Sequence, residues 1–186
     1  MDAEAFTTLY ESHYSRVYNY ISYRINNHHN TEDLVSAVFE KVMTRYDSYS
    51  VGASPLEAWI ITIARNVVMD YFRRCKRGKN WFSPWDAAAD MVSPGRQPDE
   101  LCVVHEANRG LMQALQALSE KERSIIAMKY AAGLKNREIA QVLGKGMTEN
   151  NVGVVTHRAL RKMRQYLQEE DAGYELRVRE EAANRF

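Results

Sequence analysis

The segment Leu134–Met163, with the sequence LKNREIAQVLGKGMTENNVGVVTHRALRKM, has the pattern of a helix-turn-helix. A short amphipathic stretch is followed by a glycine-containing turn and by a second stretch that is polar at its start and basic at its end. In such a motif the second helix enters the major groove of DNA. Taken alone, the segment also fits an ordinary pair of amphipathic helices with a solvated basic face.

The spacing of the apolar residues predicts which side of each helix is buried. Ile139, Ala140 and Leu143 form a one-turn apolar stripe in the first helix. The apolar residues of the second helix recur at intervals of three and four, which predicts an inward face: Val152, Val155, Ala159, Leu160 and Met163. The other positions are expected to face outward: Asn150, Asn151, Thr156, His157, Arg158, Arg161, Lys162 and Arg164. Amides and hydroxyls near the helix start can reach base edges, and the basic residues after them can hold phosphates.

The formal net charge of +1 conceals an uneven distribution of charge along the chain. Residues 108–168 contain eleven Lys and Arg against four Asp and Glu. Residues 80–107 contain five acids and one Arg, and residues 169–186 contain six acids and three Arg. A second basic cluster, RRCKRGK, lies at Arg73–Lys79. Two separate basic blocks indicate a polyanionic partner that is contacted in two places.

Length and composition exclude several classes of protein. A chain of 186 residues can form one large domain or two small ones. It has no run of about eighteen apolar residues that would span a membrane, and the start MDAEAF lacks the pattern of a secretion signal. Cys75 and Cys102 have no metal-site spacing, so neither a metal nor a cofactor is expected. We therefore expect a cytoplasmic protein with reduced thiols and no membrane insertion.

The N-terminal part of the chain begins with the pattern of two helices. A wide apolar face extends from Phe6 to Ile21, and residues 26–30 interrupt it. Thr31 is predicted to cap the second helix, because two acids follow it in what would be the first turn. Apolar residues at helical spacing then continue to Tyr46.

A third helix completes the first predicted domain, residues 1–78. Residues 47–54 form a polar loop, and Pro55 suits the first turn of a helix expected over residues 56–74. Within this helix Trp59 is expected to belong to the core. Three helices with short loops predict a small all-α domain.

Beyond this domain the helical periodicity is lost and then returns. Three of the four prolines and scattered acids predict an extended acidic linker at residues 79–106. Helices are expected at roughly 101–118 and 121–132, and Ser119 with Glu122 forms a capping box before the second of them. The second domain is predicted at residues 107–169, followed by a tail at 170–186. The expected fold is therefore all-α, with two small helical domains and a C-terminal helix-turn-helix.

The two halves together resemble an extracytoplasmic-function (group IV) sigma factor, a specificity subunit of bacterial RNA polymerase. In the first domain the matching residues are Leu9-Tyr10, His13-Tyr14, Val17-Tyr18, Glu32-Asp33-Leu34, Val38-Phe39, Trp59-Ile60, Ile63-Ala64-Arg65-Asn66, Asp70 and Arg73-Arg74. In the second they are Ala114-Leu115, Leu118, Glu122-Arg123, Tyr130, Gly133-Leu134, Glu138-Ile139-Ala140, Leu143-Gly144, Val152 and His157-Arg158-Ala159. The turn departs from the family pattern by two extra residues near Lys145-Gly146, and Gly153 and Val154 stand where polar residues are common.

The resemblance implies that each domain contacts a different part of a promoter. The second domain would bind duplex DNA of the −35 element through Thr148, Asn150, Asn151, Arg158, Arg161 and Lys162. For Thr148, Asn150 and Asn151, capping of the helix is the alternative role. The first domain would capture the non-template strand of the −10 element through Tyr49, Arg65, Asn66, Arg73, Arg74, Lys76 and Arg77. A salt bridge to Asp70 or Glu57 is the alternative role for Arg65.

The resemblance also implies protein partners. Core RNA polymerase would be contacted through its clamp coiled coil and its flap. On this chain the clamp would meet the second helix at Glu32, Asp33, Ser36, Glu40 and Lys41, for which a solvated helix face is the alternative. Many members of the family are silenced by an anti-sigma protein, and this is the third expected partner after polymerase and promoter DNA.

Two other classes of function compete with this interpretation. A stand-alone helix-turn-helix regulator would not need the first domain with its basic third helix. An enzyme would need a catalytic constellation, whereas the five histidines are scattered and the sequence has neither a phosphate-binding loop nor a nucleophile signature. We therefore expect no catalytic residues, and a role in promoter recognition.

Overall fold

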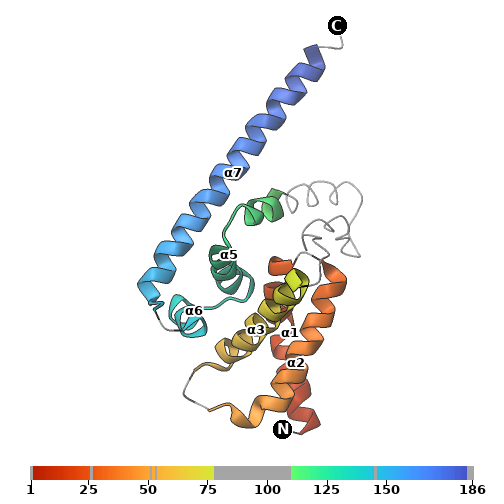
Figure 1. Cartoon of the computed structure of the whole chain (residues 1–186), viewed down its shortest axis with the longest axis vertical. Coiled ribbons are helices and arrows are strands. Elements are labelled where there is room, and N and C mark those ends of the chain that lie inside the picture. Colours follow the sequence, from red (N-terminus) through yellow and green to blue (C-terminus); the bar gives the residue numbers. More distant parts are fainter. Residues whose placement is uncertain are drawn as a thin grey trace.

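The chain folds into two helical lobes, seen in a computed structural model that describes residues 2–25, 27–50, 52, 54–77, 110–144 and 146–183 (Figure 1). Side chains are described up to Cys75 in the third helix and up to Glu169 in the last one. The described residues contain helices and turns but no strand, which confirms the predicted all-α class. The predicted linker at residues 79–106 lies outside the described residues, as does the part of the expected helix at 101–109.

The first lobe consists of α1 (Ala3–Ile25), α2 (His28–Arg45), the short 3-10 helix η1 (Tyr46–Ser48) and α3 (Leu56–Arg77). Helices α1, α2 and α3 all contact one another. Their facing sides bury the apolar stripes that the sequence predicted, with Val17, Val38 and Ala64 each fully buried. The amphipathic pattern therefore builds the three-helix core, as expected for helices whose stability comes from packing one apolar face.

The start of α2 differs from the prediction at Thr31. Asn27 is the N-cap: its backbone is extended, and its side-chain oxygen accepts a hydrogen bond from the Asn30 amide at 2.9 Å. Thr31 is buried one turn later, and its hydroxyl donates to the Asn27 carbonyl oxygen at 2.7 Å. The prediction was wrong because Asn is as good an N-cap as Thr, so the helix begins at His28.

The second lobe begins with a helical segment at residues 110–116 and continues with α5 (Glu120–Ile126) and η2 (Ala127–Ala131). The predicted capping box is present, because the Ser119 hydroxyl accepts a hydrogen bond from the Glu122 amide and the Glu122 carboxylate accepts one from the Ser119 amide. The helix predicted as one piece over 121–132 changes after Ile126 into a π-helical turn, in which the Ala132 amide donates to the Ala127 carbonyl at 3.0 Å.

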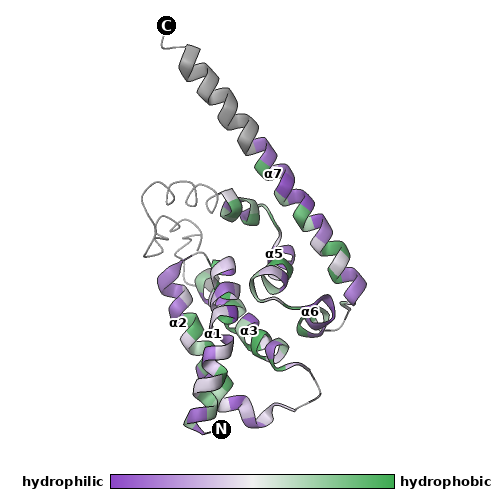
Figure 2. Cartoon of the chain, turned by 180° about the vertical axis from the view of Figure 1, so that it is seen from behind, coloured by the Kyte–Doolittle hydropathy of each residue, from purple (hydrophilic) through white to green (hydrophobic). Residues whose placement is uncertain are grey.

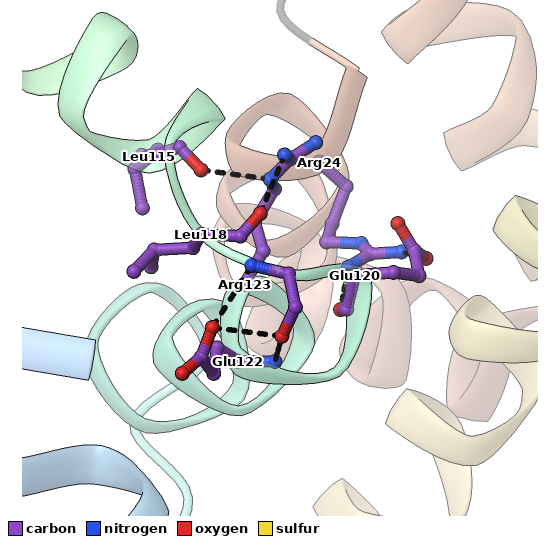
Figure 3. A network of polar contacts seen from close by, with 7 residues as sticks. Arg24, Leu115, Leu118, Glu120, Glu122 and Arg123 are labelled. Carbon is purple, nitrogen blue, oxygen red and sulfur yellow. Dashed lines mark hydrogen bonds and ion pairs between the residues drawn. The ribbon is translucent and has the colours of Figure 1, made fainter. Parts of the chain in front are cut away.

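Arg123 joins α5 to the segment before it. Its guanidinium donates to the carbonyl oxygens of Leu115 at 2.9 Å and Leu118 at 3.0 Å (Figure 3). It also donates to the carbonyl oxygen of Gln116 at 3.1 Å. These carbonyls belong to the end of the helix at 110–116 and to the turn after it, where helical backbone acceptors lose their intrahelical partners. A cation at this end also complements the helix dipole.

The helix-turn-helix consists of α6 (Asn136–Leu143) and α7 (Glu149–Ala183). Gly144 ends α6 at φ +79° and Gly146 follows in the turn at φ +89°, a backbone region that glycine adopts without a Cβ penalty. Helix α7 then extends as one rod well beyond the body of the molecule (Figure 1). It includes residues 170–183 of the predicted tail, whose side chains lie outside the described part.

The buried stripe of α7 differs from the predicted one at two positions. Val152, Thr156, Ala159 and Met163 are buried, whereas Leu160 is 39 % exposed. Thr156 was expected to face outward, but its hydroxyl donates to the Val152 carbonyl one turn earlier at 2.8 Å. A threonine can be buried at this position because its hydroxyl is hydrogen-bonded within the helix. Figure 2 shows hydrophobic and hydrophilic residues alternating around the described part of α7.

Part of the core of the second lobe is continuous with the core of the first lobe, and the rest, around Leu115, Ile126 and Ala159, is a separate cluster. The cluster of buried residues that holds α1, α2 and α3 together also includes Ile125, Met128, Ile139 and Val152 of the second lobe. Helix α1 contacts η2, and α3 contacts α6. The lobes are therefore packed against each other through apolar side chains.

A buried arginine lies at the junction of the lobes. Arg24 of α1 is 1 % exposed, and its guanidinium lies 5.6 Å from the ring centroid of Phe72. It donates to the backbone carbonyl of Glu120 at 3.1 Å and forms an ion pair with the carboxylate of the same residue (Figure 3). Burying a cation is unfavourable unless it is paired and hydrogen-bonded. The pairing of Arg24 with Glu120 therefore requires α1 to pack against the start of α5.

Candidate nucleic-acid interface

The outer side of α7 is open and polar at its first turns. Asn150, Asn151, Arg158 and Arg161 are all exposed. Helical spacing places them on one side, because positions three, four, seven and eight apart share a face. The buried stripe at Val152 and its partners lies on the opposite side and fixes the rotation of the helix about its axis. The arrangement presents amides first and guanidiniums later, which suits base edges and phosphates respectively.

Two residues predicted for this face have intramolecular partners. Thr148 immediately precedes α7, and its hydroxyl accepts a hydrogen bond from the Asn151 amide at 3.2 Å, which is the capping role given as the alternative. Lys162 donates to the carboxylate of Glu122 at 2.7 Å and thereby ties α7 to α5. Asn150 and Asn151 come after the cap, so their side chains are placed for contacts outside the helix.

A cationic pocket lies between α2 and α3 of the first lobe. It has a volume of about 350 Å³ and is lined by Lys41, Arg45, Ile63, Arg65, Asn66, Met69, Asp70 and Arg73. Four cationic side chains and one carboxylate therefore surround it. Asn66 supplies a side-chain amide with both a donor and an acceptor, the combination that pairs with a base edge. We name this the α3 pocket.

Two of the four basic residues of the α3 pocket were not predicted to lie there. Lys41 was predicted to face polymerase together with Glu40, but it lines the pocket beside Arg65. Arg45 was not predicted to have a role. Lys41 and Arg45 are four residues apart on α2 and therefore share a side of that helix. This spacing is visible in the sequence, so it could have predicted that the two side chains lie together.

The two acids that were considered as partners of Arg65 are paired elsewhere. Asp70 pairs with Arg73 at 3.0 Å, and Glu57 lies 3.8 Å from Arg16. The salt bridge to Asp70 or Glu57, given as the alternative role of Arg65, is thus replaced by these two pairs. Arg74 is exposed on the same helix. The side chains of Lys76 and Arg77, also predicted to contact DNA, lie outside the described residues.

Tyr49 anchors the loop that precedes α3. Its hydroxyl donates to the Ser54 carbonyl at 2.8 Å, and its ring lies 5.2 Å from that of Trp59. Trp59 itself packs against the core, as predicted. Tyr49 was predicted to stack on a base; in the protein without DNA its ring is packed on Trp59 and its hydroxyl shapes the loop.

A second pocket, of about 400 Å³, lies where α3 faces the second lobe. Its lining combines Arg65 and Met69 of α3 with residues of the second lobe: Glu120, Lys121, Ser124, Leu143, Gly146 and Met147. Arg65 thus borders both pockets. One side of the candidate DNA-binding surface of α3 is consequently occupied by the second lobe.

The predicted polymerase-binding side of α2 is largely exposed. The side chains that remain exposed are Glu32, Asp33, Ser36 and Glu40. Glu32 and Asp33 each lie near a histidine one turn earlier, with distances of 3.4 Å for Glu32–His28 and 3.8 Å for Asp33–His29. The Ser36 hydroxyl donates to the Glu32 carbonyl at 3.0 Å. These side chains, three of them carboxylates, form an acidic stripe on α2, and Lys41 lies apart from it. Met43, which is 51 % exposed, follows Glu40 on the same side of the helix.

The described residues show neither a metal site nor a membrane-spanning helix. Within them, no group of three or more His, Cys, Asp and Glu side chains has the arrangement of a metal site. None of the helices in the same part of the chain combines the length and the apolar character that crossing a membrane requires.

Two protein-family models match the chain, one in each lobe. Residues 9–78 match Sigma-70 region 2, and residues 108–163 match Sigma-70, region 4. Together the two models cover about two thirds of the chain. The first match contains the α3 pocket and the second contains the helix-turn-helix.

Comparisons with individual proteins lead to the same family. The chain is 29 % identical over 168 residues to the ECF RNA polymerase sigma factor SigX of Bacillus subtilis, covering 89 % of this chain and 84 % of that protein. It is 28 % identical over 169 residues to the sigma factor BldN of Streptomyces coelicolor, covering 89 % of this chain and 61 % of BldN. In fold the chain is similar to the sigma factor RpoE of Bartonella quintana, whose structure was solved in complex with the anti-sigma factor NepR. The TM-score is 0.65 and the sequence identity is 21 %, and the similarity covers 89 % of this chain and 98 % of the RpoE chain.

Proposed function

This chain belongs to the extracytoplasmic-function sigma factors of the sigma-70 family, and from this premise we propose how its helices share the recognition of a promoter. A protein of this family is the promoter-specificity subunit of bacterial RNA polymerase. It binds the core enzyme and promoter DNA and starts transcription, while catalysis belongs to the polymerase.

Helix α7 is the proposed reader of the −35 duplex. Asn150 and Asn151 lie on its exposed first turn, and Arg158 and Arg161 follow on the same side. In a helix-turn-helix the N-terminal residues of the second helix contact bases while cations hold the backbone. Lys162, which is half exposed, would have to leave Glu122 to reach a phosphate.

The α3 pocket is the proposed site for the non-template strand of the −10 element. Its cations Lys41, Arg45, Arg65 and Arg73 suit a sugar-phosphate backbone, and Asn66 suits an exposed base edge. Arg74, Lys76 and Arg77 extend this basic character along α3. The observation that carries the proposal is that one chain holds both an open helix-turn-helix and a separate cationic pocket in another lobe.

The partners follow from family membership and from the surface. The acidic stripe of α2 is the proposed contact with the polymerase clamp, since its side chains are exposed and lie away from the α3 pocket. Because RpoE, which has the same fold, binds an anti-sigma factor, we infer that this chain has such a partner too. Its place of action would be the cytoplasm, where the polymerase is.

A reconstitution experiment tests the function. The purified chain is mixed with bacterial core polymerase, the complex is isolated by gel filtration, and start sites are mapped by run-off transcription on a genomic library. We expect co-elution and a set of start sites that core enzyme alone does not use. A stand-alone helix-turn-helix regulator would bind duplex DNA without co-eluting, and that result would replace the proposal.

A matched pair of substitutions tests the role of the α3 pocket. Asn66→Ala removes the amide from the pocket, whereas Asn19→Ala removes an exposed amide from α1. We expect the first variant to bind polymerase normally but to open promoters poorly, and the second to behave as the unmodified chain. Equal opening by both variants would remove Asn66 from the site.

A further inference from the structure

An apolar side chain stands in the middle of the polar face of α7. Val154 is 49 % exposed. On its own side of the helix its neighbours one turn away are Asn150, Asn151, His157 and Arg158, all exposed. A single exposed valine is common on protein surfaces and by itself needs no explanation. Its position between the amides and the guanidiniums of the DNA-binding face is what assigns it a role.

The packing of α7 fixes where Val154 points. Val152, Thr156 and Ala159 are buried on the opposite side, which sets the rotation of the helix. A Cβ placed on Gly153 would lie 3.5 Å from the Asn136 side-chain nitrogen, so this neighbour faces α6. Val154 is the next residue, turned by about 100° away from α6. It therefore points outward, into the space that DNA would occupy.

The chemistry of valine limits what it can recognise. A β-branched side chain in a helix has one strongly preferred χ1 rotamer, so its two methyl groups are held in place. Against a base edge that carries only donors and acceptors, these methyls would remove water without returning a hydrogen bond. Thymine is the base that presents a methyl group in the major groove, beside its O4 acceptor.

We propose that Val154 is a specificity-determining residue that contacts the C5-methyl group of a thymine in the −35 element. The inference deepens the proposed function and rests on it, because it assumes that α7 occupies the major groove of promoter DNA. In this arrangement the amides before Val154 and the arginines after it position the helix, and the valine selects thymine at one base pair.

Deoxyuridine substitution isolates the methyl group. The holoenzyme is assembled from the full chain and core polymerase, and a promoter is chosen from its mapped start sites. Each thymine of the −35 segment is replaced in turn by deoxyuridine, which lacks only the methyl. We expect one position at which this lowers promoter binding on the order of fourfold, the effect of exposing one methyl-sized apolar group.

Variants of the chain connect that position to Val154. In Val154→Ala the fourfold difference between thymine and deoxyuridine should vanish, while Val154→Thr, which keeps one methyl and the β-branch, should retain part of it. Leu160→Ala is the matched control, because Leu160 is an exposed apolar residue of α7 on another side of the helix. That variant should keep the full difference. All three are surface changes and are expected to fold normally.

The outcomes separate the two hypotheses. A holoenzyme that uses no promoter would overturn both the proposed function and the role of Val154, and this is seen before any substitution is made. A holoenzyme that initiates normally but shows no thymine position sensitive to Val154, or a −35 segment without thymine, overturns the role of Val154 alone.

Discussion

The two candidate DNA-binding faces differ in how freely they meet solvent. The outer side of α7 is open along Asn150, Asn151 and Arg158. The side of α3 that carries Arg65 borders a pocket whose other wall is made by the second lobe, including the carboxylate-bearing Glu120. The first face is open to solvent, whereas the second borders the contact between the lobes.

Basic residues at helical spacing therefore do not by themselves define how a helix meets a ligand. Both helices carry cations at helical spacing, and from sequence they look alike. The partners of those cations differ, because Arg73 pairs with Asp70 within α3 while Lys162 pairs with Glu122 across two helices. Substitutions on the two faces should therefore have different effects.

The largest expected effect comes from the arginine that joins the lobes. Arg24→Ala should lower the free energy of unfolding by about 2–4 kcal/mol, because it removes buried contacts with Phe72 and charged hydrogen bonds to Glu120. Chemical denaturation measures it. Arg158→Ala on the open face of α7 should change the same quantity by less than about 0.5 kcal/mol. Equal losses in the two variants would mean that Arg24 is not buried and paired between the lobes in solution.

Salt dependence of DNA binding separates the two faces. Arg158→Ala should weaken binding to all duplexes by about 1 kcal/mol and reduce the slope of log K against log salt concentration by about 0.9. Arg65→Ala should instead reduce the slope for single-stranded DNA by about 0.7 and leave duplex binding unchanged. Titrations of the holoenzyme with both kinds of DNA measure this. The distinction between the faces fails if each variant affects both ligands alike.

Helix caps provide a comparison of smaller size. Ser119→Ala should lower stability by about 1 kcal/mol, because it removes the hydroxyl that accepts from the Glu122 amide and donates to the Glu122 carboxylate at the start of α5. Thr148→Ala should cost only about 0.5 kcal/mol, since the Thr148 hydroxyl is bonded to the Asn151 amide at 3.2 Å without the second bond, to a carboxylate, that the Ser119 hydroxyl makes. Thr148→Ser keeps the cap, so any loss of −35 binding in that variant would reveal a direct contact of the threonine methyl with DNA.

The smallest effect concerns acid pH. Burial alone would raise the pKa of Glu122, but its hydrogen bonds with Lys162 and Ser119 outweigh burial and lower the pKa below 4.5. A carboxylate with a lowered pKa stabilises the fold above pH 4.5, and this stabilisation is lost as the pH falls through the lowered pKa. Because Lys162 is half exposed, the contribution should be below about 1 kcal/mol. Unfolding midpoints measured from pH 7 to pH 3 should fall less steeply in Lys162→Met; parallel curves would contradict the assignment.

Local sequence signals predicted much of the fold and part of the site. The capping box of Ser119 and the glycine turn before α7 depend on residues three or four apart, so they are readable without a structure. The cap of α2 was misassigned because Asn27 and Thr31 are both suitable residues, and only packing selects between them. Thr156 and Leu160 were misplaced for a related reason, since a broad apolar stripe leaves the rotation of a helix uncertain by one position.

By itself, then, the sequence determined the all-α class, the helix-turn-helix and the existence of two basic regions, because these follow from spacing and charge along a few turns of chain. The tertiary structure alone decided that Arg24 binds Glu120, which is 96 positions away, and that Lys41 joins Arg65 in one pocket. The physical reason is that burial and pairing of charges depend on which helix faces are brought together, and that depends on the packing of the whole core.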